Sequence, residues 1–361
     1  MRIHTMALSF LLVAAGMVPS HADETAPPTT PHFTVEKVAP GVFVAVSRDP
    51  LGLANHSNAV FIINDEDVVV VDTQFTLQRT REVLAALRKL TDKPVSVLVN
   101  THWHDDHTFG NQVIVDAFPE VEILATEETR RDMAGIGVEN RRQQVSGAPQ
   151  GLSMFQSCIQ RRVTVQNTPM TDDQLAAYRS TVAIMQEYLN DQREFHLTLP
   201  TKTFKQKLVL KRGRRTIELR HVGPGVTPGD AIVWLPEEGV LVAGDIVDNP
   251  LPFAYRCHVS GWIRALAAVR ALKPRVIVPG HGEVMHDDAG VERLSNLLAS
   301  IRDQADAAFK RGDTPEQATA ALDIKDLRGQ IVGESGMLAF LFDGYFTDQV
   351  VASAFDEFTH P

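Results

Sequence analysis

Short runs of β-branched and aliphatic residues alternate with polar, glycine-containing segments along most of the chain, a pattern typical of a protein with many β-strands. The segment 95–99 is one example, because it is apolar enough for a strand buried in a core. Comparable runs, which we predict to supply two sheets, lie around residues 58–72, 95–100 and 121–125 for the first sheet, and around 206–221, 231–235, 240–244 and 275–279 for the second.

Helical patterns occur between these runs and at the C-terminal end. Residues 80–90 place apolar side chains on one face of a helix. A capping box formed by Thr314 and Gln317, with proline at the first helical position, opens a helical extension over residues 291–361. We interpret its apolar stretch 337–342 as core or as a self-association surface.

Residues 130–200 form a long insertion that we also expect to be helical. Thr171 and Gln174 have the spacing of a capping box, and Leu175 and Tyr178 then begin an apolar pattern at helical spacing. This pattern indicates burial but does not identify what lies beneath the helix. A lid over a cleft and a helix packed on the outside of a sheet are both consistent with it.

The N-terminus has the organisation of a secretory signal peptide over residues 1–22. Arg2 precedes an apolar core that is too short to span a membrane, and Ala22 ends a small-residue cleavage site. A Pro- and Thr-rich flexible linker follows over residues 23–34. We therefore expect a mature chain that begins at Asp23 and is periplasmic or secreted.

The composition is that of an ordinary globular protein with an acidic surface. The formal net charge of -10 argues against nucleic acid or an anionic membrane as a partner, since both require a basic surface. A small-molecule substrate is therefore the expected partner, and the sequence does not indicate the oligomeric state. Cys158 and Cys257 can oxidise in an exported protein, but the sequence leaves their pairing open.

The segment 101–107 contains the strongest chemical signal, because three histidines and two aspartates follow a predicted buried strand. His102 and His104 are two residues apart on extended backbone, so their side chains project to the same side and can share one cation. Asp106 and His107 follow on the next turn, close enough to serve a second cation. Zinc is the expected metal, with one or two ions per chain.

The pattern His-x-His-x-Asp-His resembles the signature of the metallo-β-lactamase superfamily. The resemblance extends over about residues 35–290. It implies an αββα sandwich, an α/β fold in which two packed mixed β-sheets are flanked by helices, with the metal site at one edge. The insertion at about 130–200 and the extension 291–361 would then belong to the same domain.

The resemblance also implies further site residues at the ends of other predicted strands. Asp245, after the strand around 240–244, has the position of an aspartate that bridges two metals, and His281 has that of the last histidine ligand. Asp72 has the position of a carboxylate that supports a ligand from behind. The predicted metal ligands are therefore six, His102, His104, Asp106, His107, Asp245 and His281, and Asp106 is also predicted to be catalytic.

One position departs from the family pattern. Val226 stands where relatives usually supply a third histidine to the metal that His102 and His104 hold, and valine cannot bind zinc. His221, five residues upstream, is a candidate substitute. Because of this departure, a non-catalytic or metal-impaired member that binds a ligand remains the alternative to an enzyme.

The leading hypothesis is an exported zinc-dependent hydrolase. Zinc makes hydroxide available at neutral pH for attack on a carbonyl, so a cyclic amide such as a β-lactam or an ester is the expected substrate. Phe253, Tyr255 and Trp262 follow the Asp245 strand and are candidates either for an apolar wall of the site or for the core. The fold does not choose among these substrates.

Overall fold

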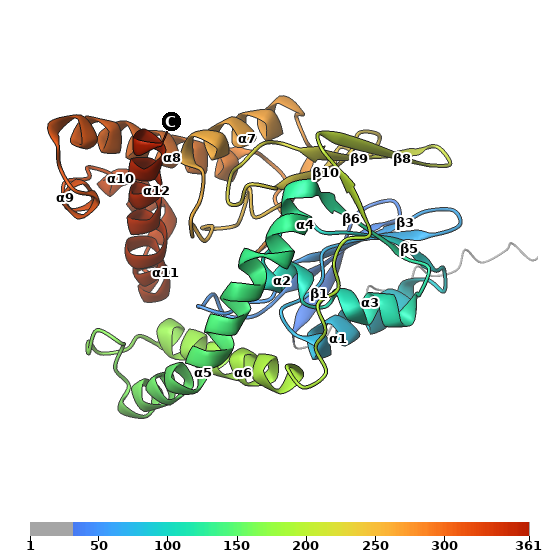
Figure 1. The fold of residues 1–361 in the computed structure, drawn as a ribbon, viewed down its shortest axis with the longest axis horizontal. Coiled ribbons are helices and arrows are strands. Elements are labelled where there is room, and N and C mark those ends of the chain that lie inside the picture. Colours follow the sequence, from blue (N-terminus) through green and yellow to red (C-terminus); the bar gives the residue numbers. More distant parts are fainter. Residues whose placement is uncertain (1–31, 361) are drawn as a thin grey trace, which may run out of the picture.

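The structure is a computed structural model that describes residues 32–360 (Figure 1). Two mixed β-sheets lie between layers of helices, so the predicted fold class is confirmed. The predicted signal peptide 1–22 and most of the predicted linker lie outside the described residues. The first strand begins at Phe33, so the linker, predicted to extend to residue 34, was placed too far along the chain.

Within residues 32–360 the larger sheet has seven strands and the smaller has five. The larger sheet contains, in spatial order, β1 (Phe33–Ala39), β2 (Val42–Ser47), β3 (Ala59–Ile63), β4 (Val68–Val71), β5 (Val95–Val99), β6 (Glu122–Thr126) and β7 (Lys202–Phe204). The smaller sheet contains β12 (Val276–Pro279), β11 (Val240–Gly244), β10 (Ala231–Leu235), β9 (Arg215–His221) and β8 (Lys207–Arg212). Each predicted strand segment is confirmed, whereas β1, β2 and β7 were not predicted.

The two sheets share a core of β-branched side chains. Alternate residues of β2, including Val42 and Val44, are buried in the same cluster as Val233 and Leu235 of β10. This alternation follows from the two-residue period of a strand, which sends every second side chain to one face. The other face of the larger sheet packs against two helices, α1 (Leu77–Leu90) and α3 (Asn111–Ala117).

The remaining helices form two groups on either side of one edge of the sandwich (Figure 1). The insertion supplies α4 (Glu127–Ala134), α5 (Ile136–Arg161) and α6 (Asp172–Asp191). The C-terminal half supplies α7 (Val259–Ala271), α8 (Ala289–Arg311), α9 (Pro315–Ala320), α10 (Lys325–Val332), α11 (Gly336–Leu341), the π-helix η1 (Phe342–Thr347) and α12 (Asp348–Thr359). Both predicted capping boxes are present, at the starts of α6 and α9.

The C-terminal helices pack on the outer face of the smaller sheet. Met337, Leu341 and Phe342 are buried in this cluster, as the core interpretation of that stretch predicted. Cys158 and Cys257 are also buried there as free thiols and do not form a disulfide with each other. Among the described residues, no helix has the length and apolar character needed to cross a membrane.

The strand order determines where the polar residues meet. β4 and β5 run parallel in the larger sheet, and β11 and β12 run parallel in the smaller sheet. The carboxyl ends of parallel neighbours lie at the same edge, where ligand sites of α/β sheets form. Four segments that carry predicted site residues therefore end close together.

Candidate metal centre

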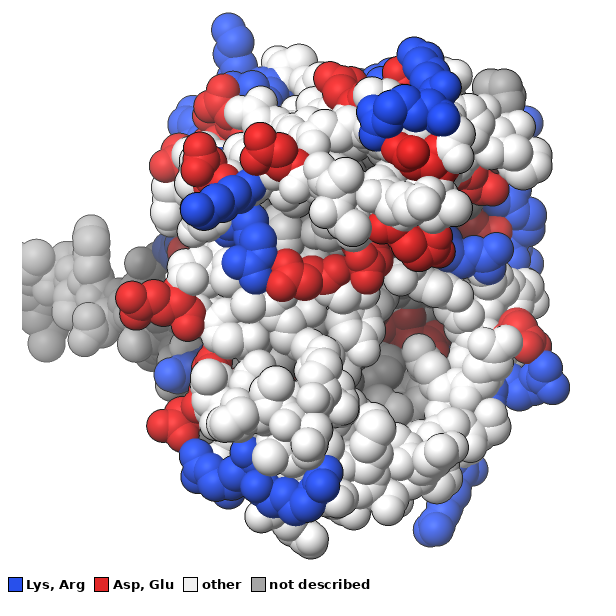
Figure 2. Space-filling view, turned by 90° about the vertical axis from the view of Figure 1, so that its left-hand side faces the viewer, with Lys and Arg blue, Asp and Glu red and all other residues white. Residues whose placement is uncertain are grey.

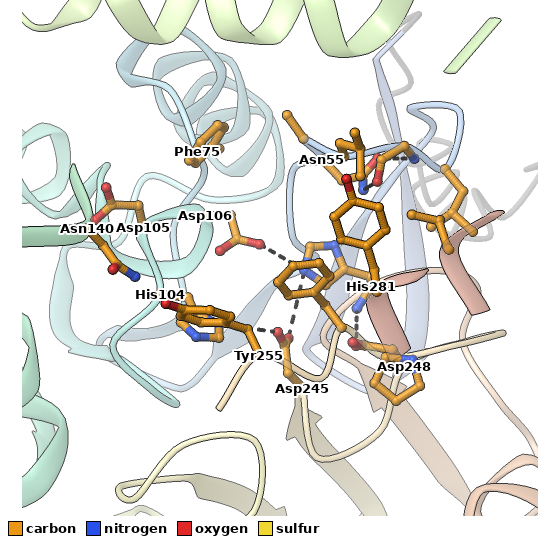
Figure 3. A pocket seen from close by; sticks show the side chains of 18 of the residues that line it. Asn55, Phe75, His104, Asp105, Asp106, Asn140, Asp245, Asp248, Tyr255 and His281 are labelled. Atoms are coloured by element: carbon orange, nitrogen blue, oxygen red, sulfur yellow. Dashed lines mark hydrogen bonds and ion pairs between the residues drawn. The ribbon is translucent and has the colours of Figure 1, made fainter. Parts of the chain in front are cut away.

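The predicted ligands come from the loops that follow three of these strands. His102 and His104 follow β5, whereas Asp106 and His107 lie in the short helix α2 (Asp105–Thr108). Asp245 follows β11, and His281 follows β12 by two residues. Figure 3 shows the side chains of Asp106, Asp245 and His281 directed toward one another.

The first group of possible ligand atoms is formed by His102, His107 and Asp245, all of which are buried. His102 Nε2 lies 3.4 Å from Asp245 Oδ2, and His107 Nε2 lies 2.9 Å from Asp245 Oδ1. His104 is farther away, with its Nδ1 3.9 Å from Asp245 Oδ2. The structure thus brings His104 next to this group but not into its tightest part.

The second group is formed by Asp106, His107 and His281. His281 Nε2 lies 3.0 Å from Asp106 Oδ2 and 3.4 Å from His107 Nε2. All six predicted ligands therefore meet at one place. His107 belongs to both groups, which the sequence did not predict.

The cluster has the properties of a cation site. His102 Nε2 and Asp245 Oδ1 are buried atoms without a hydrogen bond of normal geometry among residues 32–360, and such orphaned polar atoms are costly. Imidazole nitrogens and carboxylate oxygens are ligands that zinc accepts. The residues therefore fit a zinc ion, or a pair of ions, in this cluster.

Charge within the cluster is balanced between carboxylates and imidazoles. Burial opposes ionisation of Asp106 and Asp245, but neighbouring histidines, His107 first, hold the pKa of each carboxyl below its usual value. Burial likewise opposes protonation of His281, yet Asp245 and Asp106 raise the pKa of this histidine to about 9. A divalent cation would take the place of such protons, because metal ligands must be deprotonated.

Asp72 supports the cluster from behind. Its backbone adopts φ 60°, a left-handed conformation that aspartate tolerates better than most residues. Its carboxylate accepts hydrogen bonds from Thr101 N at 2.8 Å and Thr101 Oγ1 at 2.7 Å, and it contacts His107 Nδ1 at 2.8 Å. A histidine that donates from Nδ1 keeps the lone pair of Nε2 for a metal. Asp72 thus occupies the supporting position that the sequence indicated.

Two acidic residues near the cluster were not assigned from the sequence. Asp248 lies three residues after Asp245, accepts a hydrogen bond from the backbone N–H of His281 at 2.8 Å and lines the cavity. Burial, followed by the nearby Asp245 charge, raises the pKa of Asp248. The only sequence signal for it was its position just beyond the same strand.

Asp105 is the second such residue, although it lies inside the histidine motif. It is almost fully buried and forms a two-point ion pair with Arg141 of α5, in which Arg141 Nε lies 3.0 Å from Asp105 Oδ2. Tyr188 of α6 donates a hydrogen bond to the same carboxylate oxygen at 3.0 Å. The insertion helices α5 and α6 are therefore both tied to the segment that carries Asp106.

A cavity of about 370 Å³ opens above the ligands. Its lining residues come from the loop before β3, the metal loops, α5 and the C-terminal helices: Leu51, Gly52, Leu53, Ala54, Asn55, Phe75, Trp103, His104, Asp105, Asp106, Asn140, Gln143, Gln144, Asp245, Asp248, Leu251, Pro252, Phe253, Tyr255, His281, Leu341 and Tyr345. Figure 2 shows a hollow in this face that is bordered mainly by uncharged side chains. Metal ligands thus form the floor of a largely apolar cavity.

The structure separates the aromatic candidates. Phe253 and Tyr255 line the cavity, whereas Trp262 is fully buried in the core and donates from Nε1 to the Ile246 carbonyl oxygen at 2.9 Å. Of the two alternatives left open by the sequence, the apolar wall is therefore confirmed for Phe253 and Tyr255 and the core for Trp262. The indole is fully buried between α7 and its neighbours and therefore does not face a substrate.

His221 does not replace the missing histidine. Its Nδ1 lies 3.1 Å from the Lys205 carbonyl oxygen and its Nε2 lies 3.1 Å from the Pro228 carbonyl oxygen, so the imidazole ring lies between backbone carbonyl groups, and one of its nitrogens donates to them. Val226 is fully buried in the same apolar cluster as Trp262. The position for which the resemblance implies a histidine ligand is thus filled by core packing.

Comparison with known proteins agrees with this geometry. Residues 53–281 match the family model of the metallo-beta-lactamase superfamily. The chain is 26% identical over 276 residues to a linear primary-alkylsulfatase from Pseudomonas sp., a match that covers 70% of this chain and only 47% of that protein, so the chain spans about half its length. It is 22% identical to a metallo-beta-lactamase type 2 from Elizabethkingia meningoseptica, over 77% of this chain and 90% of that protein.

Solved structures show the same fold. The DIM-1 metallo-beta-lactamase superposes with a TM-score of 0.50 at 21% identity, covering 75% of this chain and 99% of its own. A metallo-beta-lactamase from Pontibacter korlensis superposes with a TM-score of 0.50 at 20% identity, covering 74% and 99%. With a family match over more than half of its length, the chain belongs to the metallo-beta-lactamase superfamily, whose members are metal-dependent hydrolases.

Proposed function

We propose that this chain is an exported zinc-dependent hydrolase that cleaves an ester or cyclic amide bond in a largely apolar small molecule. The observation that carries the proposal is the position of two overlapping ligand groups on the floor of an apolar cavity. A zinc ion in such a site lowers the pKa of bound water to about 7 and polarises an electrophilic oxygen. Both effects assist attack on a carbonyl group.

The residues of the chain divide the remaining tasks. Asp106, His107 and His281 would hold one ion, and His102, His104 and Asp245 would hold a second. Asp72 keeps the Nε2 lone pair of His107 available. Apolar side chains of the lining, such as Leu251 and Phe253, would exclude water from a bound substrate, which strengthens the electrostatic interactions made with it.

The charge of the lining favours a neutral substrate. Among the described residues that line the cavity, none is lysine or arginine, whereas Asp105, Asp106, Asp245 and Asp248 are all acidic. An alkyl sulfate or another anion would depend on the metal alone for its opposite charge. An uncharged ester or lactam has no such requirement, so we favour it although one relative is named as an alkylsulfatase.

A ligand-binding protein without catalysis is the second candidate, and Val226 is the observation that favours it. Once His107 binds an ion together with Asp106 and His281, the first group is left with His102, Asp245 and the more distant His104, and Val226 adds no further ligand. The second group does not depend on Val226. We therefore favour hydrolysis with at least one tightly held ion.

The test combines metal analysis with turnover. Zinc per chain would be measured together with hydrolysis of a chromogenic lactam, a set of p-nitrophenyl esters and an alkyl sulfate. Asp106→Asn should abolish turnover, whereas Asp116→Asn, a change at an exposed position in α3, should not. Zinc-loaded protein that hydrolyses none of these compounds would favour the binding protein, and preference for the alkyl sulfate would contradict the argument from charge.

A further inference from the structure

Exposed aromatic side chains gather at the mouth of the metal cavity. Phe253 is 45% exposed and Tyr255 is 37% exposed, and both line the cavity. Most large apolar side chains of the chain lie in the core, so two half-exposed aromatic rings beside a cavity need an explanation. A ligand that covers them would provide one.

The C-terminal extension supplies a third ring at this position. Tyr345 and Leu341 line the cavity, and the ring of Tyr345 stacks on that of Phe253 with centroids 6.0 Å apart and planes inclined by 28°. Phe340 packs against Tyr345 from the side, at 5.4 Å between centroids. Both lining residues lie beyond 281, where the family match ends.

The backbone around Tyr345 is also unusual. Tyr345 lies in the π-helix η1, which continues directly from α11 into α12. π-helical turns are rare and occur frequently at functional sites, because the extra residue per turn displaces a side chain from the regular helical face. The position of this turn agrees with a role for Tyr345 in the cavity rather than in the helical core.

The wall contributed by the insertion has a different chemistry. Gln143 and Gln144 lie three and four positions after Asn140 on α5, and all three line the cavity with amide groups. The two walls therefore differ, one polar and uncharged and one aromatic and aliphatic. A substrate with a polar, uncharged part and an apolar tail matches both.

We propose that Tyr345, Phe253 and Leu341 form a binding wall for the apolar acyl chain of an ester substrate, so that the C-terminal extension determines chain-length preference. This inference rests on the proposed hydrolytic function and specifies its substrate class. Each methylene that is buried against the wall should raise kcat/KM by about fourfold until the wall is covered. The carbonyl would then lie on the metal side of the cavity and the tail at its mouth.

The experiment compares p-nitrophenyl esters from acetate to octanoate in the wild-type enzyme and in Tyr345→Ala. The wild type should prefer octanoate to acetate by at least tenfold, and Tyr345→Ala should lose about tenfold on octanoate with little change on acetate. Phe309→Ala is the matched control, because Phe309 is also a partly exposed C-terminal aromatic residue that packs on other rings, those of Phe355 and Phe358, but does not line the cavity.

Binding is measured separately from catalysis. Calorimetric titration of the protein as purified with octanamide should show binding to the wild type and to Phe309→Ala and at least tenfold weaker binding to Tyr345→Ala. Equal hydrolysis of all chain lengths, equal loss on acetate and octanoate, or no octanamide binding would overturn the inference. Octanamide binding without hydrolysis of any ester would support the wall and contradict the proposed function instead.

Discussion

The substitution Asp72→Asn tests how the metal centre is supported, because it changes one atom type and preserves the shape of the side chain. Asparagine tolerates the left-handed backbone found at this position. The Oδ1 atom would still accept the hydrogen bond from Thr101 N. The second oxygen, which contacts both Thr101 Oγ1 and His107 Nδ1, would become an NH₂ group that can only donate.

This exchange inverts the tautomer of His107. Its Nδ1 must then accept, so the proton moves to Nε2, the atom that lies 2.9 Å from Asp245 Oδ1 and 3.4 Å from His281 Nε2. A protonated Nε2 has no lone pair for a metal, and His107 belongs to both ligand groups. Changes to groups that hold a metal ligand cost about 10- to 100-fold in affinity, or about 1.4 to 2.7 kcal/mol.

The assay is competition for zinc between the protein and a chromophoric chelator. Asp67→Asn is a suitable control, since Asp67 is also a buried carboxylate with hydrogen-bond partners, Ser96, Asn64 and Arg212, but lies away from the ligands. We expect Asp72→Asn to lose zinc affinity and Asp67→Asn to keep it. Unchanged affinity in Asp72→Asn, or equal loss in both variants, would refute the tautomer argument.

Four further predictions address the ligands, the insertion and export. Asp106→Asn removes a ligand charge, so ester or lactam turnover should fall far more than tenfold; a smaller loss, about 1.4 kcal/mol of barrier, would contradict the assigned role. Val226→His adds an imidazole beside the first group, so zinc retained at limiting free metal should rise, and equal stoichiometry and affinity would show that this side chain points only into the core. Arg141→Met leaves the buried carboxylate of Asp105 without its ion-pair partner and should lower the free energy of unfolding in urea by about 2–4 kcal/mol, whereas a loss below about 1 kcal/mol would show that the pair is solvated. Terminal sequencing of extracytoplasmic protein should begin at Asp23, and an intact Met1 on cytosolic protein would exclude export.

The strands that carry ligands could be predicted from the sequence, because in each of them an apolar run is followed directly by residues that can bind a metal. Val95 to Val99 form a run without polar interruption, apart from Ser96, and the histidines follow at once. β1 and β2 were missed although Phe33, Val35, Val42 and Val44 alternate correctly on both sides of a Pro-Gly turn. The Pro- and Thr-rich residues before them made the start of this hairpin resemble a linker.

The ties between the insertion and the metal loop were not predictable in the same way. Asp105 and Arg141 are 36 positions apart, and Asp105 and Tyr188 are 83 apart. Hydrophobic periodicity indicates which helix face is buried but does not identify a polar partner across the fold. The contacts within the cavity walls could not be predicted for the same reason, since Tyr345 meets Phe253 only after the C-terminal helices pack on the smaller sheet.

Because Val226 replaces the expected histidine, we expect the two ligand groups to differ in their affinity for zinc. Hydrogen bonds within the loop hold its shape, because Thr227 donates to both carboxylate oxygens of Asp230, from N at 2.9 Å and from Oγ1 at 2.7 Å. His107 cannot compensate, since the single Nε2 lone pair serves one ion at a time. When that atom binds together with Asp106 and His281, a second ion has only His102, His104 and Asp245. We therefore expect one zinc ion to be held tightly and a second to depend on the free zinc concentration.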